Sequence, residues 1–485
     1  MSILDNLFAK KESEANKKIT KEEIAEMLSV SPEFLAEFEK QYKKCGDIEE
    51  KNNDNFFKVN AKQASSALEH ADDVRVDGLV SRIVNELLAQ TELYCYDGKT
   101  GSYKDLGADI LQAPEGPVRA EDILSLPEEI RPQLAGNLIQ KDISGEAYPV
   151  ILSLYKKYLD STDAKEKQMS YNLFRQGLDI QDLDPVLYEI IGMNPNSIGN
   201  WFPKLVEAVR LQDFFKLPET TIVKVPLPLL QLTRLPYDGL TPTTVQILDR
   251  YCMKAFSLDE AKEYFIKTGT YSSKFDFRNA RVYSPKEVRE IGEYLLFIHF
   301  QALQMASPLS SPCIYGVSTT NEWCVREYIS PKEVLPTIYH GLPLRNEMRA
   351  FIDFDAEEPV LGIVPYWHPE VMMKKLGEDA DTGDLDGIHD YGTYCAGKDK
   401  IMQQFESSKD MVQKQLHKLA KEMDMHGQWS MDIMQNGNDF YIIDMALAKD
   451  SALKEYLPAG VIKPVEENWI PNLREKDNSA NGESK

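Results

Sequence analysis

The segment GQWSMDIMQNGNDFYIID, residues 427–444, constrains the possible folds of this chain more than any other stretch. Two apolar-rich runs flank an Asn-Gly-Asn turn at 436–438, which predicts a β-hairpin. If residues 437–439 form a three-residue loop, Asp432 and Asp444 lie directly opposite each other, with Cβ atoms roughly 4.5–5.5 Å apart. Two carboxylates at that separation repel unless a proton or a cation lies between them, and Mg²⁺ would suit. The hairpin therefore predicts a magnesium site, unless one Asp faces solvent at its rim.

From about residue 196 onward, strand-like runs alternate with helix-like runs, a pattern typical of an α/β or α+β enzyme. We expect strands at 221–225, 263–267, 323–329, 347–354, 429–434 and 440–444, and helices at 286–305 and 409–423.

The preceding part of the chain has a different character. Residues 1–45 read as a charged N-terminus and a helical hairpin, and residues 46–195 as a mostly helical domain that begins with a polar linker at 46–62. Residues 473–485 carry almost no apolar side chains and are expected to be a disordered tail. The main α+β domain is therefore expected to span residues 196–472.

The phrase KEEIAEMLSVSPEFLAEF, residues 21–38, resembles a helix-turn-helix of the DNA-reading type. The alternative is a pair of helices that packs on its neighbours. The formal net charge of −23 favours this alternative, because gripping nucleic acid generally needs a basic surface.

The sequence also predicts a compartment. The start MSILDNLFAKKESEANKK lacks the apolar core of a signal peptide, and no apolar run is long enough to span a bilayer. The six cysteines are dispersed without a CxxC pair, which argues against a zinc site or a disulfide framework. We therefore expect a soluble protein of a reducing cytoplasm, with no membrane partner.

The stretch EYFIKTGTYSSKFDF, residues 263–277, places two lysines around a loop of small residues. Lys267 ends one strand-like run, and Lys274 opens another. Small residues let backbone N–H groups approach a polyphosphate, and lysines add positive charge. The loop hydroxyls that would join them belong to Thr268, Thr270, Ser272 and Ser273. The segment lacks the Walker A pattern, and a polar β-hairpin with its lysines in solvent is the alternative interpretation.

Two further strands carry candidate binding groups. The run WCVREYI, residues 323–329, would read an adenine if it were a strand edge with free backbone groups at Glu327 and Ile329. In PLRNEMRAFID, residues 343–353, the side chains of Arg345, Glu347 and Arg349 share one face of a strand. Two guanidiniums around one carboxylate are either a structural ion-pair cluster or a phosphate clamp, and the residues alone leave both open.

Four motifs follow one another in this order: the lysine loop, the REYI strand, the Arg-x-Glu-x-Arg-x-Phe strand and the hairpin ending in IID. Together they resemble the ATP-grasp superfamily. The stretches FIKTGTYSSKFDF and RNEMRAFIDF look most like a phage-linked and bacterial clade of that superfamily, and more distantly like the eukaryotic cell-division-cycle ATP-grasp proteins. The resemblance covers about residues 196–472. It implies two α+β subdomains that grip ATP, preceded by a mostly helical N-terminal region.

The resemblance also implies roles for individual residues. Arg349, with Arg345, would face the γ-phosphate or an acyl phosphate, and Asp432 and Asp444 would hold Mg²⁺. Lys267 would bind the ATP phosphates and share in catalysis. The implied ATP-binding residues are Lys224, Lys267, Thr268, Gly269, Ser272, Ser273, Lys274, Arg326, Glu327, Tyr328 and Ile329, the last four as an adenine hinge.

The sequence departs from the family pattern at two places. The family hairpin ends with an acidic residue, a spacer and Asn, whereas here Asp444 is followed by Met and then Ala446. One ligand of the second metal ion is therefore absent or comes from elsewhere in the chain, and Asp450 is a candidate. The family also has an earlier lysine, for which Lys224 is the candidate and Lys204 competes.

The function that the resemblance implies is an ADP-forming ligase that uses ATP and Mg²⁺. It would convert a small-molecule or peptide carboxylate to an acyl phosphate, which an amine or thiol then attacks. The alternative is a non-catalytic protein of the same fold that binds ATP and acts in assembly, which the missing Asn and the helical N-terminal region favour. A DNA-associated regulator acting through residues 21–38 is the second alternative.

Two smaller features complete the sequence analysis. Residues 377–392 are rich in Asp without the residue order of an EF-hand, so we expect an exposed loop near the substrate entrance. His368 is expected to be a packed or solvent-facing residue rather than a base.

Overall fold

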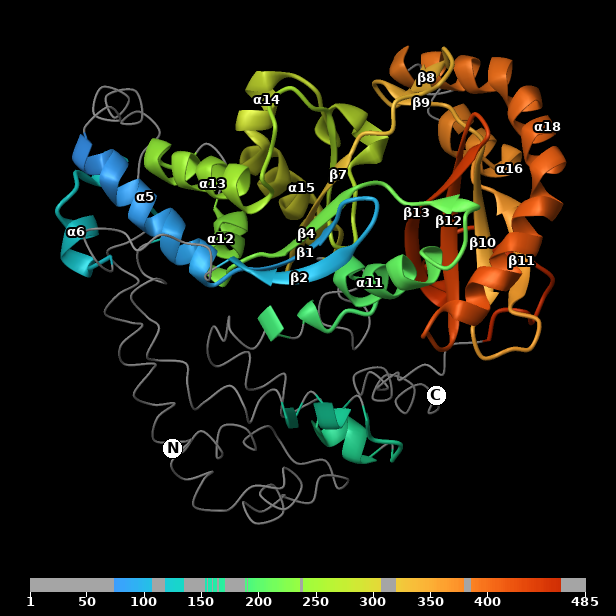
Figure 1. The fold of residues 1–485 in the computed structure, drawn as a ribbon, viewed down its shortest axis with the longest axis horizontal. Coiled ribbons are helices and arrows are strands. Elements are labelled where there is room, and N and C mark those ends of the chain that lie inside the picture. Colours follow the sequence, from blue (N-terminus) through green and yellow to red (C-terminus); the bar gives the residue numbers. More distant parts are fainter. Residues whose placement is uncertain are drawn as a thin grey trace, which may run out of the picture.

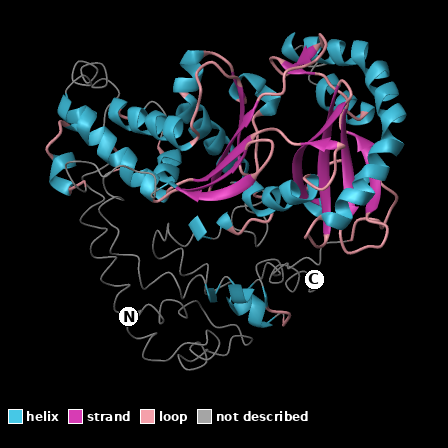
Figure 2. Cartoon of the chain, viewed as in Figure 1, coloured by secondary structure: helices cyan, strands magenta, loops and turns pink. Residues whose placement is uncertain are grey.

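The structure is a computed structural model that describes residues 74–106, 118–134, most of 153–170, 188–189, 191–235, 239–306, 320–378 and 385–463. The expectations for residues 1–45, the linker 46–62, the segment 21–38 and the tail 473–485 lie outside these residues. In the described part, helices and largely antiparallel sheets mix along the chain, which confirms the predicted α+β class (Figure 2).

The first of two main sheets has six strands, and every neighbouring pair is antiparallel. Its order is β2 (Gly101–Asp105), β1 (Glu92–Tyr96), β4 (Thr220–Lys224), β7 (Glu322–Glu327), β5 (Tyr264–Thr268) and β6 (Arg281–Val282).

Helices α5 (Val74–Ala89), α13 (Pro242–Ala255) and α15 (Ile291–Ala306) gather on one side of this sheet (Figure 1). Trp323 and Val325 of β7 point into the core under these helices, whereas Cys324 points into a second core on the other face. This alternation is the period of two that a strand imposes on its side chains.

The second sheet has five strands in the order β11 (Val360–Pro365), β10 (Glu347–Asp353), β12 (Gln428–Asn436), β13 (Asp439–Leu447) and β3 (Phe215–Lys216). Only the short β3 runs parallel to its neighbour. The long helix α18 (Leu385–Glu422) covers one face (Figure 1).

The second core holds the two sheets together. Helix α11 (Ile198–Val209) contributes Trp201 and Phe202, which pack with Ile222 of β4 and with apolar residues of the second sheet such as Met348. Both sheets are therefore anchored on one continuous apolar cluster, and their facing surfaces have a defined relation to each other.

Shorter elements connect these layers. They are α6 (Ala120–Leu124), α12 (Leu227–Gln231), α14 (Pro285–Arg289), α16 (Pro369–Met372), the strands β8 (Thr337–Ile338) and β9 (Leu342–Pro343), the π-helix η8 (Met373–Gly377), and the 3₁₀-helices η3 (Glu128–Ile130), η5 (Leu232–Arg234), η7 (Lys274–Asn279), η9 (Ala448–Asp450) and η10 (Lys454–Tyr456).

Three expectations need correction. Residues 92–105 were expected in a helical domain, but they form β1 and β2 and pair with β4, so residue 195 is not a boundary of this sheet. Such five-residue strands depend on non-local pairing, which a local pattern does not reveal. The helix expected at 286–305 is interrupted at Glu290, the C-cap of α14. Residues 385–392, expected in a loop, belong to α18.

None of the helices in the described ranges combines the length and the apolar character that crossing a bilayer would require.

Candidate functional site

A pocket lies where the two sheets face each other. The empty space within it, open solvent at its mouth included, is about 770 Å³. Its charged lining residues are Lys267, Lys274, Arg326, Glu327, Arg345, Glu347, Asp432 and Asp444, and its other lining residues are Pro218, Phe265, Ser272, Phe277, Tyr328, Ile329, Leu342, Pro343, Met434 and Ile443.

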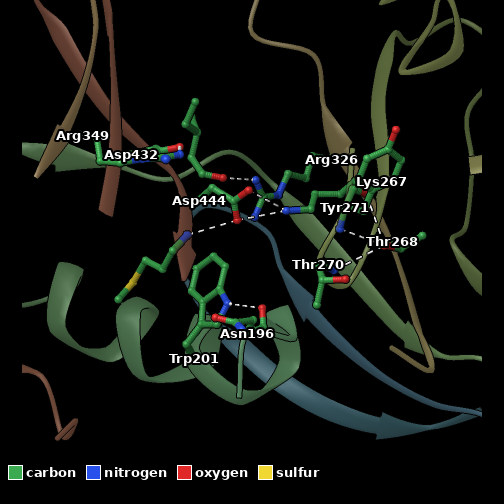
Figure 3. A network of polar contacts seen from close by, with 12 residues as sticks. Asn196, Trp201, Lys267, Thr268, Thr270, Tyr271, Arg326, Arg349, Asp432 and Asp444 are labelled. Carbon is green, nitrogen blue, oxygen red and sulfur yellow. Dashed lines mark hydrogen bonds and ion pairs between the residues drawn. The ribbon is translucent and has the colours of Figure 1, made fainter. Parts of the chain in front are cut away.

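Lys267 reaches the pocket from the end of β5. Its neighbour Ile266 points into the helix-covered core, so strand alternation turns Lys267 toward the second sheet. The lysine side chain is 1% exposed, and its Nζ donates to both carboxylate oxygens of Asp444, at 3.0 and 2.9 Å (Figure 3). Burial alone would raise the pKa of Asp444, but Lys267 and Arg326 offset this effect and lower it.

Arg349 and Asp432 form a second ion pair, within the second sheet. They are register partners on β10 and β12, and the guanidinium binds the carboxylate with two parallel hydrogen bonds, Nε to Oδ1 at 2.7 Å and Nη2 to Oδ2 at 2.8 Å. Burial would lower the pKa of Arg349, but Asp432 more than offsets this and raises it. This bidentate geometry is the strong form of the Arg–carboxylate interaction.

Asp432 and Asp444 are register partners, as predicted, but by a different route. The turn has two residues, because Asn436 pairs with Asp439, and a register shift between Asp432 and Ile433 then restores the pairing of the two aspartates. The expected loop of residues 437–439 is therefore wrong, and the extra residue lies in a β-bulge. Lys267 and Arg349, rather than a proton, neutralise the two carboxylates.

Glu347 occupies the position expected between two arginines, but it forms an ion pair with neither. Arg345 donates to the carbonyl of Ile329, and Arg349 binds Asp432. The Glu347 side chain is buried and lines the pocket, and no described side chain donates a hydrogen bond to its carboxylate. Burial raises its pKa, although Lys274 acts in the opposite direction. The predicted common face exists, whereas the predicted cluster centred on Glu347 does not.

The loop after Lys267 is a turn held by hydrogen bonds of its own backbone and of neighbouring elements. Thr268 N–H donates to the carbonyl of Tyr271 at 2.9 Å, and Tyr271 N–H donates to the hydroxyl of Thr268 at 2.9 Å. Gly269 N–H donates to the carbonyl of Glu322 on β7, and its own carbonyl accepts from Ile198 N–H at the start of α11. The backbone N–H groups of residues 268–271, which were expected to meet a polyphosphate, thus already have protein partners.

The residues after this turn also differ from expectation. Lys274 begins the 3₁₀-helix η7 rather than a strand. Its Nζ lies 4.0 Å from the ring centroid of Tyr366, and the side chain lines the pocket. Burial would lower the pKa of Lys274, but Tyr366 and Glu347 offset it and raise the pKa. Ser272 lines the pocket too, whereas Thr268, Gly269 and Ser273 are not among its lining residues.

The expected adenine hinge lines the pocket, but its premise of a free edge is wrong. Strand β7 lies between β4 and β5, so both of its edges are paired. Glu327 N–H donates to the carbonyl of Glu219, and the Ile329 carbonyl accepts from Arg345. Arg326 spans the two sheets through a hydrogen bond from Nη1 to the carbonyl of Ile443 (Figure 3).

Neither upstream lysine lines the pocket. The Nζ of Lys224 lies 5.7 Å from the ring centroid of Tyr188, and the Nζ of Lys204 donates to the carbonyl of Asp424 at 2.8 Å. Asp450, the candidate for the missing metal ligand, accepts a hydrogen bond from Asn196 at 3.0 Å and is also not a lining residue.

The structure supports the interpretation of His368 as a packed residue. Its ring stacks on that of Tyr456, with centroids 3.7 Å apart.

The apolar half of the pocket was missed by sequence reasoning. Met434 and Ile443 line it from the second sheet, Phe265 from β5 of the first sheet, and Phe277 from η7. Met434 was within reach of prediction, because it lies two residues from Asp432 on the same strand face. The same signal was available for Phe265, which lies two residues from Lys267 on β5, but not for Phe277, which η7 carries to the pocket.

The donor set fits a metal-bound nucleotide. The lining holds four basic side chains and four acidic ones, so a triphosphate would bring negative charge into a pocket of zero formal charge, and a divalent cation would offset part of it. Asp444 Oδ1 accepts from both Lys267 and the N–H of Met445, whereas Asp444 Oδ2 and both oxygens of Asp432 keep a lone pair beyond their present hydrogen bond. Carboxylates are ligands that Mg²⁺ accepts. Within the described residues no third Asp, Glu, His or Cys completes a metal-binding group.

Comparisons with known proteins add little. No family model and no curated protein matches the chain. Among solved structures, the chain is similar to C-terminally truncated Cdc123 from Schizosaccharomyces pombe, with 10% identity, a TM-score of 0.30, and coverage of 52% of this chain and 83% of that one. For Cdc123 from the same organism the identity is 12% and the TM-score 0.29, at the same coverage. At TM-scores of this size the similarity carries no argument about fold or function.

Proposed function

We propose that the pocket binds ATP together with Mg²⁺, and that the protein uses ATP as an ADP-forming ligase acting on a carboxylate. The observation that carries the proposal is that Lys267 and Asp444, from opposite sheets, meet in one pocket with Arg326, Lys274 and Asp432. This is the meeting of basic and acidic groups that a metal-bound polyphosphate requires.

The pocket lining divides into apolar side chains and charged side chains. Met434, Ile443, Phe265 and Leu342 supply apolar surface that would suit a purine base. Lys267 and Lys274 supply amino groups that would suit phosphates. Such a division favours a nucleoside triphosphate over a purely apolar ligand or a small inorganic anion.

The chemistry that we propose has two balanced steps. A substrate carboxylate oxygen attacks the γ-phosphorus, the bond to the β-phosphate oxygen breaks, and ADP leaves. An amine or thiol then attacks the activated carbonyl, loses its proton, and displaces inorganic phosphate. Lys274, which lines the pocket, would neutralise charge that develops in the first step, and Arg349, which binds Asp432 but is not a lining residue, would do so after release from that pair. Magnesium, when bound, would supply further charge neutralisation at Asp432 and Asp444.

A second candidate function is ATP binding without turnover, in assembly or partner binding. The observation that favours it is the hairpin end, where Ala446 stands at the position of a further ligand and no third metal-binding side chain lies nearby among the described residues. A nucleotide would then stabilise the closed arrangement of the two sheets without being consumed.

Two measurements test these candidates. Calorimetry with a non-hydrolysable ATP analogue and MgCl₂ should show binding to the wild type, and Lys267→Ala should weaken it by about 100-fold, since a buried charged partner is lost. Lys216→Ala is the matched control, because Lys216 pairs with Asp439 outside the pocket. Unchanged binding by Lys267→Ala would refute the proposal.

The second measurement is ADP release from ATP in the presence of pools of carboxylates and amines. Release that depends on both pools supports the ligase. Binding without release under any pairing supports the non-catalytic candidate.

A further inference from the structure

The two carboxylates proposed to hold the metal are already bound to protein cations. Asp432 receives two hydrogen bonds from Arg349, and Asp444 receives two from Lys267. The cations proposed to meet phosphate and the carboxylates proposed to meet metal are therefore partners of each other. These four side chains therefore neutralise one another in two ion pairs.

Burial makes these pairs hard to break from one side. The Lys267 side chain is 1% exposed, those of Arg349 and Asp432 are 14% and 7% exposed, and that of Asp444 is 38% exposed. A charge left without a partner at such depth is strongly unfavourable, because water cannot replace the lost interaction. A ligand that takes the partner away from Lys267, Arg349 or Asp432 therefore leaves a buried charge in that state, whereas Asp444 keeps partial contact with solvent.

A triphosphate or a divalent cation that binds without the other breaks an ion pair from one side only. A triphosphate alone would draw Lys267 away and leave Asp444 beside both the phosphate and its register partner Asp432. A divalent cation alone would take the carboxylates and leave Lys267 buried without an anion. When both bind together, every charge exchanges one partner for another of the same sign.

We propose that Lys267 and Arg349 serve as internal counter-ions of the pocket, and that a divalent cation and a nucleoside triphosphate displace them only together. The inference rests on the proposed nucleotide binding and goes further by assigning a binding rule to that site. Lys267 and Asp444 belong to different sheets. When the cation and the triphosphate displace this ion pair, the ligands bridge the two sheets in place of the direct contact between the two side chains.

The test uses the full chain and three titrations by calorimetry: MgCl₂ alone, a non-hydrolysable ATP analogue in EDTA, and the analogue with MgCl₂. The analogue should bind about 100-fold more tightly with MgCl₂ than without, at the upper end of ordinary coupling between ligands. MgCl₂ alone should show no binding up to millimolar concentration. Binding of MgCl₂ alone below that range, or equal binding of the analogue in both conditions, would overturn the inference.

Variants separate this rule from ordinary charge attraction. Asp444→Asn should bind the analogue in EDTA on the order of tenfold more tightly than the wild type, because Lys267 is released and one negative charge is gone. Asp432→Asn repeats the test on the other pair, so the result does not depend on a single variant folding. Asp439→Asn is the control on the same hairpin, since its carboxylate pairs with Lys216 and Lys332 outside the pocket.

The outcomes distinguish this inference from the proposed function. If the wild type binds the analogue with MgCl₂ while both variants bind it no better in EDTA, the counter-ion rule is wrong and nucleotide binding stands. If the wild type does not bind the analogue in either condition, the proposed function is wrong and the counter-ion rule falls with it.

Discussion

Lys267 and Asp444 are separated by 177 positions in the chain and belong to different sheets, yet the lysine Nζ lies within 3.0 Å of both oxygens of the aspartate. Asp444 stands beside Asp432, which Arg349 holds in the same way. Two ion pairs therefore lie side by side at the junction of the sheets. Several consequences of this arrangement and of its surroundings are open to measurement.

The first prediction concerns the pair of Arg349 and Asp432. Arg349→Ala should lower the free energy of unfolding by about 3 kcal/mol, because it leaves a buried carboxylate without its partner. Adding Asp432→Asn should recover much of that loss. Denaturant unfolding of the two single variants and the double variant gives the coupling energy. The exposed pair of Arg278 and Asp276 is the control, with a coupling expected below about 1 kcal/mol. Equal couplings for both pairs would contradict the buried character of the first.

The second prediction concerns the apolar wall of the pocket. Met434→Ala should weaken binding of the ATP analogue by about tenfold, because the base would lose most of its contact with one side chain. Met434→Leu, which keeps most of the volume, should have little effect. Calorimetry of both variants checks this expectation. A loss of the same size in both would mean that Met434 acts on the fold rather than on the ligand.

The third prediction concerns the hairpin turn. Gly437 has a φ of +63°, and a Cβ there would meet the Lys332 side chain at 3.0 Å. Gly437→Ala should therefore destabilise the protein by about 1 kcal/mol. Gly78→Ala is the opposite control, because it lies in helix α5 with no atom within 4 Å of the added Cβ, and it should stabilise by about 0.5–1 kcal/mol. Thermal unfolding that showed both variants to be equally stable would contradict the turn assignment.

The fourth prediction concerns Asp249 of α13, which lies against the start of α15. Burial raises the pKa of its carboxyl from 3.8 to about 7, although the backbone N–H groups of Glu293 and Gly292 act against this. A carboxyl with a raised pKa in the folded state stabilises the fold below its ordinary pKa, and that contribution is lost as the pH rises from about 4 to about 7. Asp249→Asn should remove this part of the pH dependence. Melting curves between these two pH values check it, and a variant that keeps the wild-type slope would contradict it.

The elements of the fold and the site differ in how far they could be predicted from the sequence. The hairpin at 427–444 was predictable, because an Asn-Gly turn between apolar runs is a local signal. The register of its two aspartates was predicted correctly from a turn length that is wrong, since a bulge compensates for the shorter loop. A bulge is favoured by how the strand fits its neighbours, and those neighbours are distant in sequence.

The loop at 268–273 shows the opposite case. Its small residues suggested free backbone groups, but the fold brings β7 and α11 alongside and uses those groups for hydrogen bonds. The same holds for residues 326–329, where the segments at Glu219 and Glu263 bind the N–H groups of Glu327 and Tyr328, and Arg345 binds the carbonyl of Ile329. A sequence signals the capacity for a backbone hydrogen bond, and only the packed neighbours decide which partner takes it.

The sequence by itself determined the α+β class, the strands that became β5, β7, β10, β12 and β13, and the common face of Arg345, Glu347 and Arg349, because these follow from local propensity and from the two-residue period of a strand. Only the tertiary structure decided that Lys267 would bind Asp444, that Arg349 would bind Asp432, and that Glu347 would have no hydrogen-bonding side chain among the described residues. Pairing of buried charges depends on distances between strands far apart in the chain, and those distances exist only after the two sheets have packed on a shared core.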